Sequence, residues 1–453
     1  MAEAVERADP GVVDEWVRGA AVAALLPPRR QGGAALSGHV EPTDRLAVAA
    51  GVWLSVAALG GAFVVVPVAD PDAPRRAVAG DGAFAGLLST MLEDRASGSF
   101  RGEAYLPPGH PDGGAGPPPL LDGGDERAID VDQSNDSVIV GGSAVVKLFP
   151  LAAPGPQPGL DLPIHLASVG FPSHPAPLGA LRWRSPGGDE VVLATASAYL
   201  PGARDGWVWY LERALRWLDG TIDDPAAFDP APAMGRIAAR MHAALGTPSP
   251  VIPDPVREAD VATADAWRRS ALGVAAQASA LTPGDEGARL IVRTGPIRAA
   301  LDELGDAVGT VTTRVHGDFH VGQVLEWERG YAVTDFDGDP MTPPAERAGF
   351  DTPVRDVAAF MRSIDHVGRV ASTRRLGRDV DVDAWIATSR AGFLDAYRHE
   401  LEGLGAGASL DERLLRPLEV AQACHEFVYA ARFLPRWLPV ADRAMQALIP
   451  AEA

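Results

Sequence analysis

The chain has 453 residues and a formal net charge of −20, and 47% of its residues are hydrophobic. This length and composition predict a globular protein with a sizeable core and about three domains or subdomains. The negative charge argues against nucleic acid and anionic membranes as partners, because both require a basic surface. The single cysteine, Cys424, excludes a disulfide framework and a cysteine-rich metal site, and it fits a reducing cytoplasm.

The first hundred residues combine helical and apolar segments, which predicts a mixed α/β unit. Helices are expected at residues 11–26 and 83–92, the latter with apolar residues at helical spacing. Between them, residues 46–69 carry no charge and are long enough to span a bilayer. Because Gly60-Gly61 interrupts this stretch and Pro67 closes it, two buried strands with a Gly-Gly turn are favoured. A membrane-tethered protein is the alternative.

A Pro- and Gly-rich segment without periodicity, residues 106–124, predicts a loop or linker. We place a domain boundary near residue 127, so that residues 1–127 form an N-terminal cap. After this boundary, Val138–Val140 and Ala144–Phe149 are predicted strands, and Gly141-Gly142 is the hairpin turn between them.

Lys147 lies inside the second of these strands. A buried lysine is costly unless it is paired or binds an anion, and the alternative is a side chain that reaches the surface. A kinase-like loop further along the chain favours a contact between Lys147 and nucleotide phosphates, with Asp161 as the acid that holds the lysine. The polar loop Gln133, Ser134 and Asn135 precedes the hairpin, where a phosphate-covering loop is expected, although it is not glycine-rich.

Strands are predicted to continue to about residue 200, so residues 128–202 form a β-rich nucleotide-binding lobe. Residues 203–453 are predicted to form a larger, mostly helical lobe. Its helices are expected from Trp207 onward, within residues 254–308 with a break at Thr282-Pro283-Gly284, and at residues 383–402 and 413–434. His242 lies on an apolar helix face, and a packed core histidine is favoured over a ligand.

Residues 315–340 predict a short β-hairpin whose loops carry acidic residues. Asp318 follows His316-Gly317, Gln323 comes five residues later, and Asp335 follows the hairpin. Kinases place a catalytic Asp, an amide and a metal-binding Asp in this order. The spacing therefore predicts Asp318 as the base for the attacking hydroxyl, with Gln323 and Asp335 as Mg²⁺ ligands. A surface hairpin with solvated acids is the alternative.

These segments resemble the actinobacterial maltokinase-like kinases of the aminoglycoside phosphotransferase and choline kinase superfamily. The matching strings are Gln133-Ser134-Asn135, Lys147-Leu148-Phe149, Asp205-Gly206-Trp207, His316 to Leu325 and Arg355-Asp356-Val357-Ala358. The resemblance implies an α+β, bilobal eukaryotic-like kinase fold with an N-terminal α/β cap, and ATP and Mg²⁺ as cofactors. By position, it implies the roles given above for Lys147, Asp318, Gln323 and Asp335. It also implies that Asp356 braces the catalytic loop, with His316 and Arg355 as further structural support.

The chain departs from the maltokinases at two places. It has Asp337-Gly338-Asp339 where they have Glu-Gly-Glu, and Gln422-Ala423-Cys424-His425-Glu426 where they have Lys-Ala-Leu-Tyr-Glu. On a helix, Gln422, His425, Glu426 and Tyr429 share one face. This face is predicted to bind the acceptor together with Asp337, and an ordinary packed helix face is the alternative.

The loss of a lysine makes this face more anionic, which favours a cationic acceptor. An ammonium group beside a lysine is repelled by roughly 1–4 kcal/mol at contact distance. A glucosamine kinase branch among these relatives makes ATP-dependent phosphorylation of glucosamine the favoured function. The alternatives are a maltokinase that forms maltose 1-phosphate, another small-molecule kinase such as an aminoglycoside phosphotransferase, and a nucleotide-binding pseudokinase. A cytoplasmic monomer or weak homodimer is expected.

Overall fold

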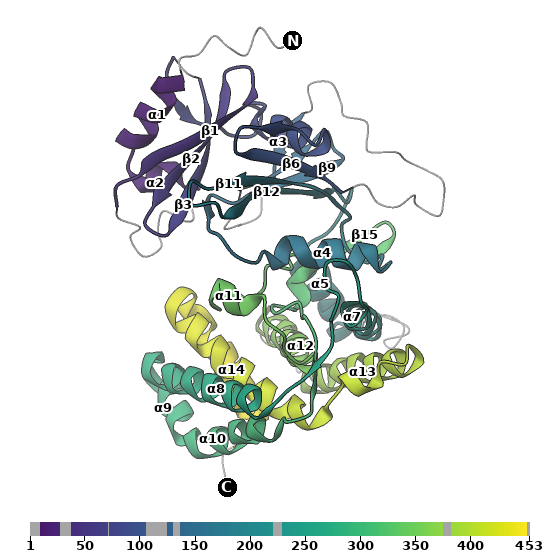
Figure 1. The fold of residues 1–453 in the computed structure, drawn as a ribbon. Coiled ribbons are helices and arrows are strands. Elements are labelled where there is room, and N and C mark those ends of the chain that lie inside the picture. The colour runs from purple at the N-terminus through teal and green to yellow at the C-terminus, as the bar shows by residue number, and fades with distance from the viewer. Residues whose placement is uncertain are drawn as a thin grey trace. The chain divides into compact units, whose positions relative to one another are not determined.

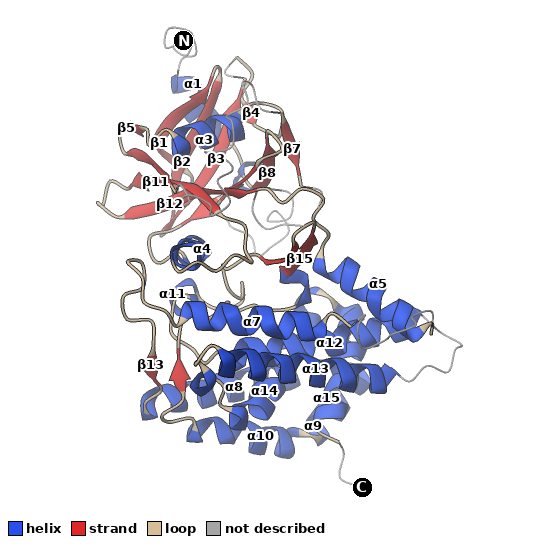
Figure 2. Ribbon diagram, turned by 90° about the vertical axis from the view of Figure 1, so that its right-hand side faces the viewer, coloured by secondary structure: helices blue, strands red, loops and turns tan. Residues whose placement is uncertain are grey.

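The computed structural model describes residues 10–27, 38–70, 72–105, 125–129, 136–220, 229–374 and 382–450. The chain divides into two compact units (Figure 1). The first contains residues 1–167 and 175–201, and the second contains residues 168–174 and 202–453. The first unit is rich in strands and the second in helices (Figure 2).

The described strands of the first unit form two antiparallel sheets. One sheet has the order β1-β2-β3-β10, with β4 also paired to β3, and the other has the order β5-β6-β11-β12-β9-β8-β7. The first sheet consists of β1 (Glu41–Ala49), β2 (Val52–Leu59), β3 (Ala62–Ala69), β4 (Arg75–Arg76) and β10 (Leu151–Ala152). The second consists of β5 (Ala96–Ser97), β6 (Phe100–Ala104), β7 (Glu126–Ala128), β8 (Asp136–Val140), β9 (Ala144–Leu148), β11 (Pro177–Arg184) and β12 (Glu190–Ala198).

The uncharged stretch at residues 46–69 forms strands. Strands β2 and β3 pair from Val52↔Ala69 to Leu59↔Ala62, around a turn at Gly60-Gly61. Gly60 has a φ of +61°, a conformation that suits a residue without a Cβ. The predicted hairpin is thus confirmed. Among the described helices, none combines the length and apolar character needed to cross a membrane.

Two helices stand at the start of the chain where one was predicted. The expected helix at residues 11–26 is divided into α1 (Pro10–Gly19) and α2 (Val22–Leu25), because Ala21 adopts an extended backbone between them. The predicted helix at 83–92 is α3 (Ala83–Leu92). The carboxylate of Glu126 accepts hydrogen bonds from the backbone N–H groups of Gly80, Gly82 and Ala85 at the start of α3. A carboxylate is favourable there because the N-terminus of a helix carries unpaired N–H groups.

The predicted boundary near residue 127 falls inside strand β7. Strand β6, from the predicted cap, pairs with β11 of the predicted nucleotide lobe from Gly179↔Ala104 to Trp183↔Phe100. One buried core also includes side chains from both sides of this boundary, among them Leu54, Phe84 and Trp183. The sheet and the core therefore continue across residue 127, and the division into cap and nucleotide lobe remains a prediction.

The second unit is built mainly from helices. They are α5 (Gly206–Leu218), α7 (Ala231–Leu245), α8 (Val261–Leu281), α9 (Gly284–Val292), α10 (Thr294–Asp302), α11 (Pro344–Arg347), α12 (Val354–Arg374), α13 (Val382–Gly403), α14 (Leu415–Phe433) and α15 (Leu438–Leu448). Short strands are β13 (Arg257–Glu258), β14 (Val311–Thr312), β15 (Val324–Trp327) and β16 (Gly330–Val333), and short 3-10 helices are η3 (Glu303–Asp306), η4 (Val321–Gln323), η5 (Gly407–Ser409), η6 (Glu412–Leu414) and η7 (Pro435–Trp437).

The ends of these helices follow from the sequence. The side chains of Asp205 and Asp260 accept hydrogen bonds from Val208 N and Thr263 N, so each caps the first turn of its helix. The predicted break at Thr282-Pro283-Gly284 separates α8 from α9. The segment after that break holds two helices rather than one, because the backbone departs from helical geometry at Arg293.

Candidate active site

The predicted catalytic hairpin is present in the second unit. Strands β15 and β16 pair from Val324↔Val333 to Trp327↔Gly330, with a two-residue turn at Glu328-Arg329. The N–H of Thr334 also donates to the carbonyl of Gln323, at 2.9 Å. This pairing brings the end of the loop that carries Asp318 next to the segment that begins at Asp335.

Asp356, at the start of α12, holds the loop before the hairpin. Its two carboxylate oxygens accept the N–H groups of His316 at 2.8 Å and Gly317 at 2.9 Å. On its other side, Asp356 lies 3.1 Å from Nε2 of His242, whose Nδ1 lies 2.7 Å from the Tyr397 hydroxyl. Burial by itself raises the pKa of Asp356, but His242, His316 and these N–H groups outweigh it and lower the pKa. Asp356 is therefore a buried, ionised brace, and His242 is a packed core histidine.

The His316 ring packs between the two acidic segments. Its Nε2 lies 2.9 Å from the carbonyl oxygen of Thr334, and its ring lies 4.8 Å from that of buried Phe336. Gly317 and Gly338, with φ values of +80° and +74°, allow a close approach here, because a Cβ on Gly317 would lie 3.5 Å from Gly338. These contacts fix the Asp318 loop against the loop that follows Asp335.

The start of helix α5 supports the same loop from another side. A Cβ on Gly206 would overlap the carbonyl oxygen of Val321, so only glycine permits this approach. Three residues later, Nε1 of Trp209 donates to the carbonyl of Val324 at 3.0 Å. The string Asp205-Gly206-Trp207 therefore combines a helix cap, a close backbone contact and an indole that lies beside Gly322 of the same loop.

Asp318 carries a carboxylate that is about one-third exposed, at 32%. Within the described part of the chain no donor reaches hydrogen-bond distance of it, and Nε2 of His320 lies 3.9 Å from its Oδ2. Burial and the charges of Asp339 and Asp335 raise the pKa of Asp318 to about 8. A carboxylate in this state has a high proton affinity and no competing donor, which suits a general base.

Gln323 lies at the end of the catalytic loop, three residues after His320. The Nδ1 atom of His320 accepts the N–H of Gly322 at 3.0 Å, and its Nε2 lies 3.5 Å from Nε2 of Gln323. Burial, assisted by His316, lowers the pKa of His320 to about 4, so its imidazole is neutral near pH 7. His320 is thus an uncharged neighbour that contacts the Gln323 amide.

Asp335 has an exposed side chain and a left-handed backbone, with a φ of +62°. Aspartate is among the few residues that tolerate this conformation, and such positions often mark functional sites. Gln323 and Asp335 fit a Mg²⁺ ion, which is typically held by one or two protein oxygens and by nucleotide phosphates. The described residues include no group of three or more His, Cys, Asp or Glu side chains able to hold a metal by themselves.

Helix α14 joins this acidic group through His425. Its Nε2 lies 3.0 Å from Oδ2 of Asp339. Burial by itself lowers the pKa of His425, but the carboxylates of Asp339, Asp318 and Glu426 outweigh it and raise the pKa. Asp337, and not Asp339, was predicted to belong to the acceptor site. The available signal was the alternation Asp335, Asp337, Asp339, and the structure shows that Asp339 contacts α14.

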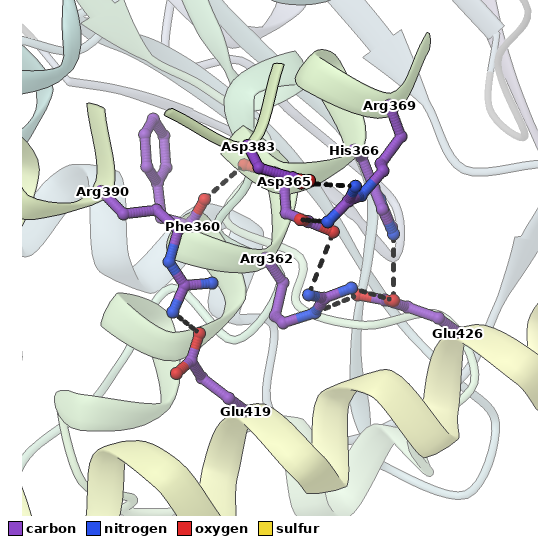
Figure 3. Close-up of polar contacts among 10 residues, drawn as sticks. Phe360, Arg362, Asp365, His366, Arg369, Asp383, Arg390, Glu419 and Glu426 are labelled. Carbon is purple, nitrogen blue, oxygen red and sulfur yellow. Dashed lines mark hydrogen bonds and ion pairs between the residues drawn. The ribbon is translucent and has the colours of Figure 1, made fainter. Parts of the chain in front are cut away.

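Glu426, on the same helix, is part of a buried ionic network (Figure 3). It lies 2.9 Å from Nη2 of Arg362 and 2.9 Å from Nε2 of His366, both on α12. Arg362 is fully buried and also donates to Asp365 at 3.2 Å. Burial by itself raises the pKa of Glu426, but Arg362 and His366 outweigh it and lower the pKa to about 2. Much of the negative charge of Glu426 is therefore balanced within the protein.

The remaining residues of the predicted acceptor face, Gln422 and Tyr429, make fewer polar contacts. Gln422 is half-buried, and its amide has no hydrogen-bond partner within the ranges the structure describes. Tyr429 is 41% exposed, and its ring lies 5.2 Å from that of exposed Phe433. The face thus has a free amide and a partly exposed phenol on either side of the His425 and Glu426 pairs.

The predicted nucleotide residues belong mostly to the first unit. Lys147 lies on the half-buried face of β9, with Nζ 5.8 Å from the ring centre of Phe149. Asp161 lies in the first turn of α4 (Pro158–Ser168), next to Leu160, which packs in one cluster with Phe149. The pairing of Asp161 with Lys147 remains a prediction. Gln133, Ser134 and Asn135 lie outside the described residues.

A further signal for Lys147 is present in the composition. It is the only lysine among the 40 Lys and Arg residues of the chain. Every other residue of this Lys and Arg group is an arginine, so a lysine ammonium group occurs at position 147 alone.

The predicted support residue Arg355 donates to Asp351 at 2.6 Å, and Asp351 pairs with Thr313 just before the catalytic loop.

The sequence pattern of the APH phosphotransferase enzyme family matches residues 125–406. The chain belongs to this phosphotransferase family. The predicted family membership and the predicted α+β kinase fold are therefore confirmed. The family match begins close to the predicted boundary near residue 127 and ends before α14.

Glucosamine kinases are similar to this phosphotransferase in sequence and structure. The enzyme of Streptacidiphilus jiangxiensis is 43% identical over 332 residues, which are 72% of this chain and 74% of that protein. The enzyme of Mycolicibacterium smegmatis is 37% identical over 327 residues, 72% of this chain and 79% of that protein. A solved glucosamine kinase (crystal form B) matches 96% of this chain and 99% of its own, with a TM-score of 0.80 and 35% identity. Another, in complex with glucosamine, ADP and inorganic phosphate, matches the same shares with a TM-score of 0.77 and 36% identity.

Proposed function

We propose that this phosphotransferase transfers the γ-phosphoryl group of ATP to a hydroxyl group of glucosamine. The observation that carries the proposal is the extent of the match to the glucosamine kinase solved with glucosamine and ADP. That match covers 96% of this chain, whereas the general phosphotransferase pattern ends at residue 406. The similarity to glucosamine kinases therefore extends beyond the shared catalytic part of the family, into the C-terminal region that holds α14.

The acidic group in the second unit accounts for the chemistry. Asp318 accepts the proton of the attacking sugar hydroxyl, the new O–P bond forms, and the bond to ADP breaks. Gln323 and Asp335 would hold Mg²⁺, which would supply positive charge to neutralise the phosphates. Lys147 contacts the phosphates with Asp161 as its partner, and the loop at Gln133 to Asn135 covers them.

Helix α14 supplies the acceptor residues in this proposal. Gln422 binds a sugar hydroxyl through its free amide, and Glu426 accepts the amine on the lone pairs that Arg362 and His366 leave unused. His425, Tyr429 and Asp337 complete the set. The glutamine at position 422 supports an aminated acceptor, because a lysine there repels an ammonium group by roughly 1–4 kcal/mol.

A panel assay of ADP formation tests the proposal, with glucosamine, glucose, maltose, choline and an aminoglycoside as acceptors. We expect the highest kcat/KM for glucosamine. A preference for maltose or for the aminoglycoside would contradict the proposal and would support the corresponding kinase. A lack of ADP formation with every acceptor, in folded protein, would support the nucleotide-binding pseudokinase. The cytoplasmic location remains part of the proposal, supported by the lone cysteine, and the oligomeric state remains a prediction.

A further inference from the structure

Two tryptophans connect the catalytic loop with the ionic network of α14. Trp207 lies in the first turn of α5, and Trp437 is the last residue of η7, just after α14. Their ring centres lie 6.0 Å apart with an interplanar angle of 69°. Both side chains are half-buried, so each ring keeps part of its surface exposed within this unit.

Trp207 is packed directly on the catalytic loop. A Cβ on Gly322 would lie 2.9 Å from Cδ1 of Trp207 and 2.7 Å from Cε1 of His320. The indole therefore occupies the space beside Gly322, immediately before Gln323. Glycine is needed here because a larger residue would displace either the indole or the imidazole.

Trp437 lies beside the ionic network of Glu426. Its ring centre lies 6.2 Å from that of His366, at an angle of 65°. His366 contacts Glu426 at 2.9 Å. The two indoles thus form a continuous aromatic wall from the residue next to Gln323 to the residue next to the Glu426 carboxylate.

An aromatic wall beside such a polar group has a specific use. A pyranose ring has an apolar face of C–H groups and an edge of hydroxyls, so its binding site needs an aromatic surface next to hydrogen-bonding groups. We propose that Trp437 is a specificity-determining residue that packs against the pyranose ring of the acceptor, with Trp207 holding its indole in place. This inference rests on the proposed function, since it requires a sugar acceptor at α14.

Recognition by Trp437 differs from recognition by the carboxylates and the amide. The indole contacts ring C–H groups that glucosamine and glucose share, so it contributes equally to both sugars. Gln422 and Glu426 face the substituents, where the two sugars differ. Trp437 therefore sets the preference for a pyranose ring, and the polar residues set the preference for the amine.

The experiment compares the wild type with Trp437→Leu, Trp437→Phe and Trp267→Leu in the full-length chain. Trp267, on α8, is a matched control because it is also half-buried and packs on the same helical core as Trp437. We expect Trp437→Leu to raise the KM for glucosamine about ten-fold and to weaken competitive inhibition by glucose by the same factor. The KM for ATP should change less than about two-fold. Trp437→Phe, which keeps an aromatic face, should stay within about three-fold of the wild type.

Three outcomes overturn the inference. They are an unchanged glucosamine KM in folded Trp437→Leu, an equal rise in Trp267→Leu, and a rise for glucosamine without a matching change for glucose.

If Trp437→Leu does not fold, Trp437→Phe answers the same question through tryptophan fluorescence. Addition of glucosamine should then change the emission of the wild type more than that of Trp437→Phe, and equal changes contradict the inference. Failure of the proposed function looks different, because wild-type protein would then form no ADP with glucosamine.

Discussion

The Nε2 atom of His425 lies 3.0 Å from Oδ2 of Asp339, and this pair joins helix α14 to the loop that follows the catalytic hairpin. Asp339 is held in turn by the N–H of Met341, which donates to its Oδ1 at 2.8 Å. A residue on α14 is thus linked electrostatically to the acids around Asp318.

The His425–Asp339 pair predicts a dependence of stability on pH. The pKa of His425 is raised above 6.5 in the folded protein, because nearby carboxylates outweigh burial. Its stabilising contribution is therefore complete below pH 6.5 and is lost as the pH rises through the folded-state pKa. The pKa of Asp339 is lowered below 3.8, because His425 and backbone N–H groups outweigh burial, so its own contribution is lost only as the pH falls below that range.

We therefore expect His425→Gln to be less stable than the wild type by about 1–2 kcal/mol at pH 5–6, and by less at pH 9. Thermal unfolding across this pH range measures the difference. His399→Gln is the control, since His399 is exposed on α13. A Tm difference for His425→Gln that stays constant from pH 5 to pH 9 would show that the pair is not charged in the folded protein.

Asp318→Asn should separate catalysis from stability. We expect kcat to fall by at least about 100-fold, the range for loss of a general base, while nucleotide binding persists. The pKa of Asp318 is raised by burial and by Asp339 and Asp335. At pH values above the ordinary pKa of an aspartate, the charge on Asp318 therefore destabilises the folded protein. The variant should consequently have a higher Tm than the wild type at pH 8 without Mg²⁺. Near-normal turnover by folded Asp318→Asn would refute the assignment of the base.

The metal ligands make a second kinetic prediction. Gln323→Ala should be partly rescued by higher Mg²⁺ concentrations, since an amide contributes less to Mg²⁺ binding than a carboxylate does. Asp335→Gly should remain inactive at every Mg²⁺ concentration, and it is the cleaner test because glycine adopts the left-handed backbone of Asp335 without strain. Titrations of Mg²⁺ at saturating ATP measure both. If added Mg²⁺ leaves the Gln323→Ala defect unchanged, Gln323 is not a ligand.

Because Lys147 is the only lysine, it can be labelled selectively. An amine-reactive reagent should modify one side chain besides the terminal amine, and Mg²⁺–ATP should protect it if it contacts phosphate. Lys147→Arg keeps the charge but not the compact ammonium group, so we expect a rise of about ten-fold or more in the KM for ATP. Intact mass and peptide mapping measure the labelling. Equal labelling of Lys147 with and without Mg²⁺–ATP would place it away from the nucleotide.

The sequence was sufficient to predict the features that depend on neighbours along the chain. The hairpin turns at Gly60-Gly61 and Gly141-Gly142 follow from turn residues between apolar runs, and both hairpins are present. The third predicted hairpin is also present, with its turn at Glu328-Arg329 inside the polar turn expected at residues 326–330. The spacing of Asp318, Gln323 and Asp335 is equally local. Helix 11–26 was wrong because nothing in its apolar pattern indicated the extended backbone at Ala21.

Contacts between distant segments were beyond such an analysis. Arg362 and Glu426 are 64 residues apart, and only the packing of α12 against α14 brings them together. The pairing of His425 with Asp339 and the contact between Trp207 and Trp437 also join segments that are far apart in the sequence. The sequence could identify an acidic, polar face on α14, but it gave no indication of which charges on that face are already balanced.

This balance changes how the preference for an amine should be tested. Replacing Glu426 leaves the buried guanidinium of Arg362 with Asp365 as its remaining carboxylate partner, and breaking a buried pair costs about 3–5 kcal/mol. Glu426→Gln should therefore lower the Tm and weaken the use of every acceptor. It reports on the fold of α12 and α14 as much as on the amine.

Gln422 is the better position for this test, because its amide has no partner to lose among the described residues. We expect Gln422→Lys to lower kcat/KM for glucosamine about ten- to hundred-fold and to change glucose inhibition much less, since only glucosamine places an ammonium group near the new charge. Gln422→Met is the matched control, because it has a similar length without the amide or the charge. It should affect both sugars alike through the lost hydrogen bond.

In the wild type, a pH increase through the pKa of the sugar amine should reproduce the selective loss, because the carboxylate of Glu426 attracts only the protonated form. Equal losses for glucosamine and glucose in Gln422→Lys would mean that α14 supports the fold and does not recognise the amine.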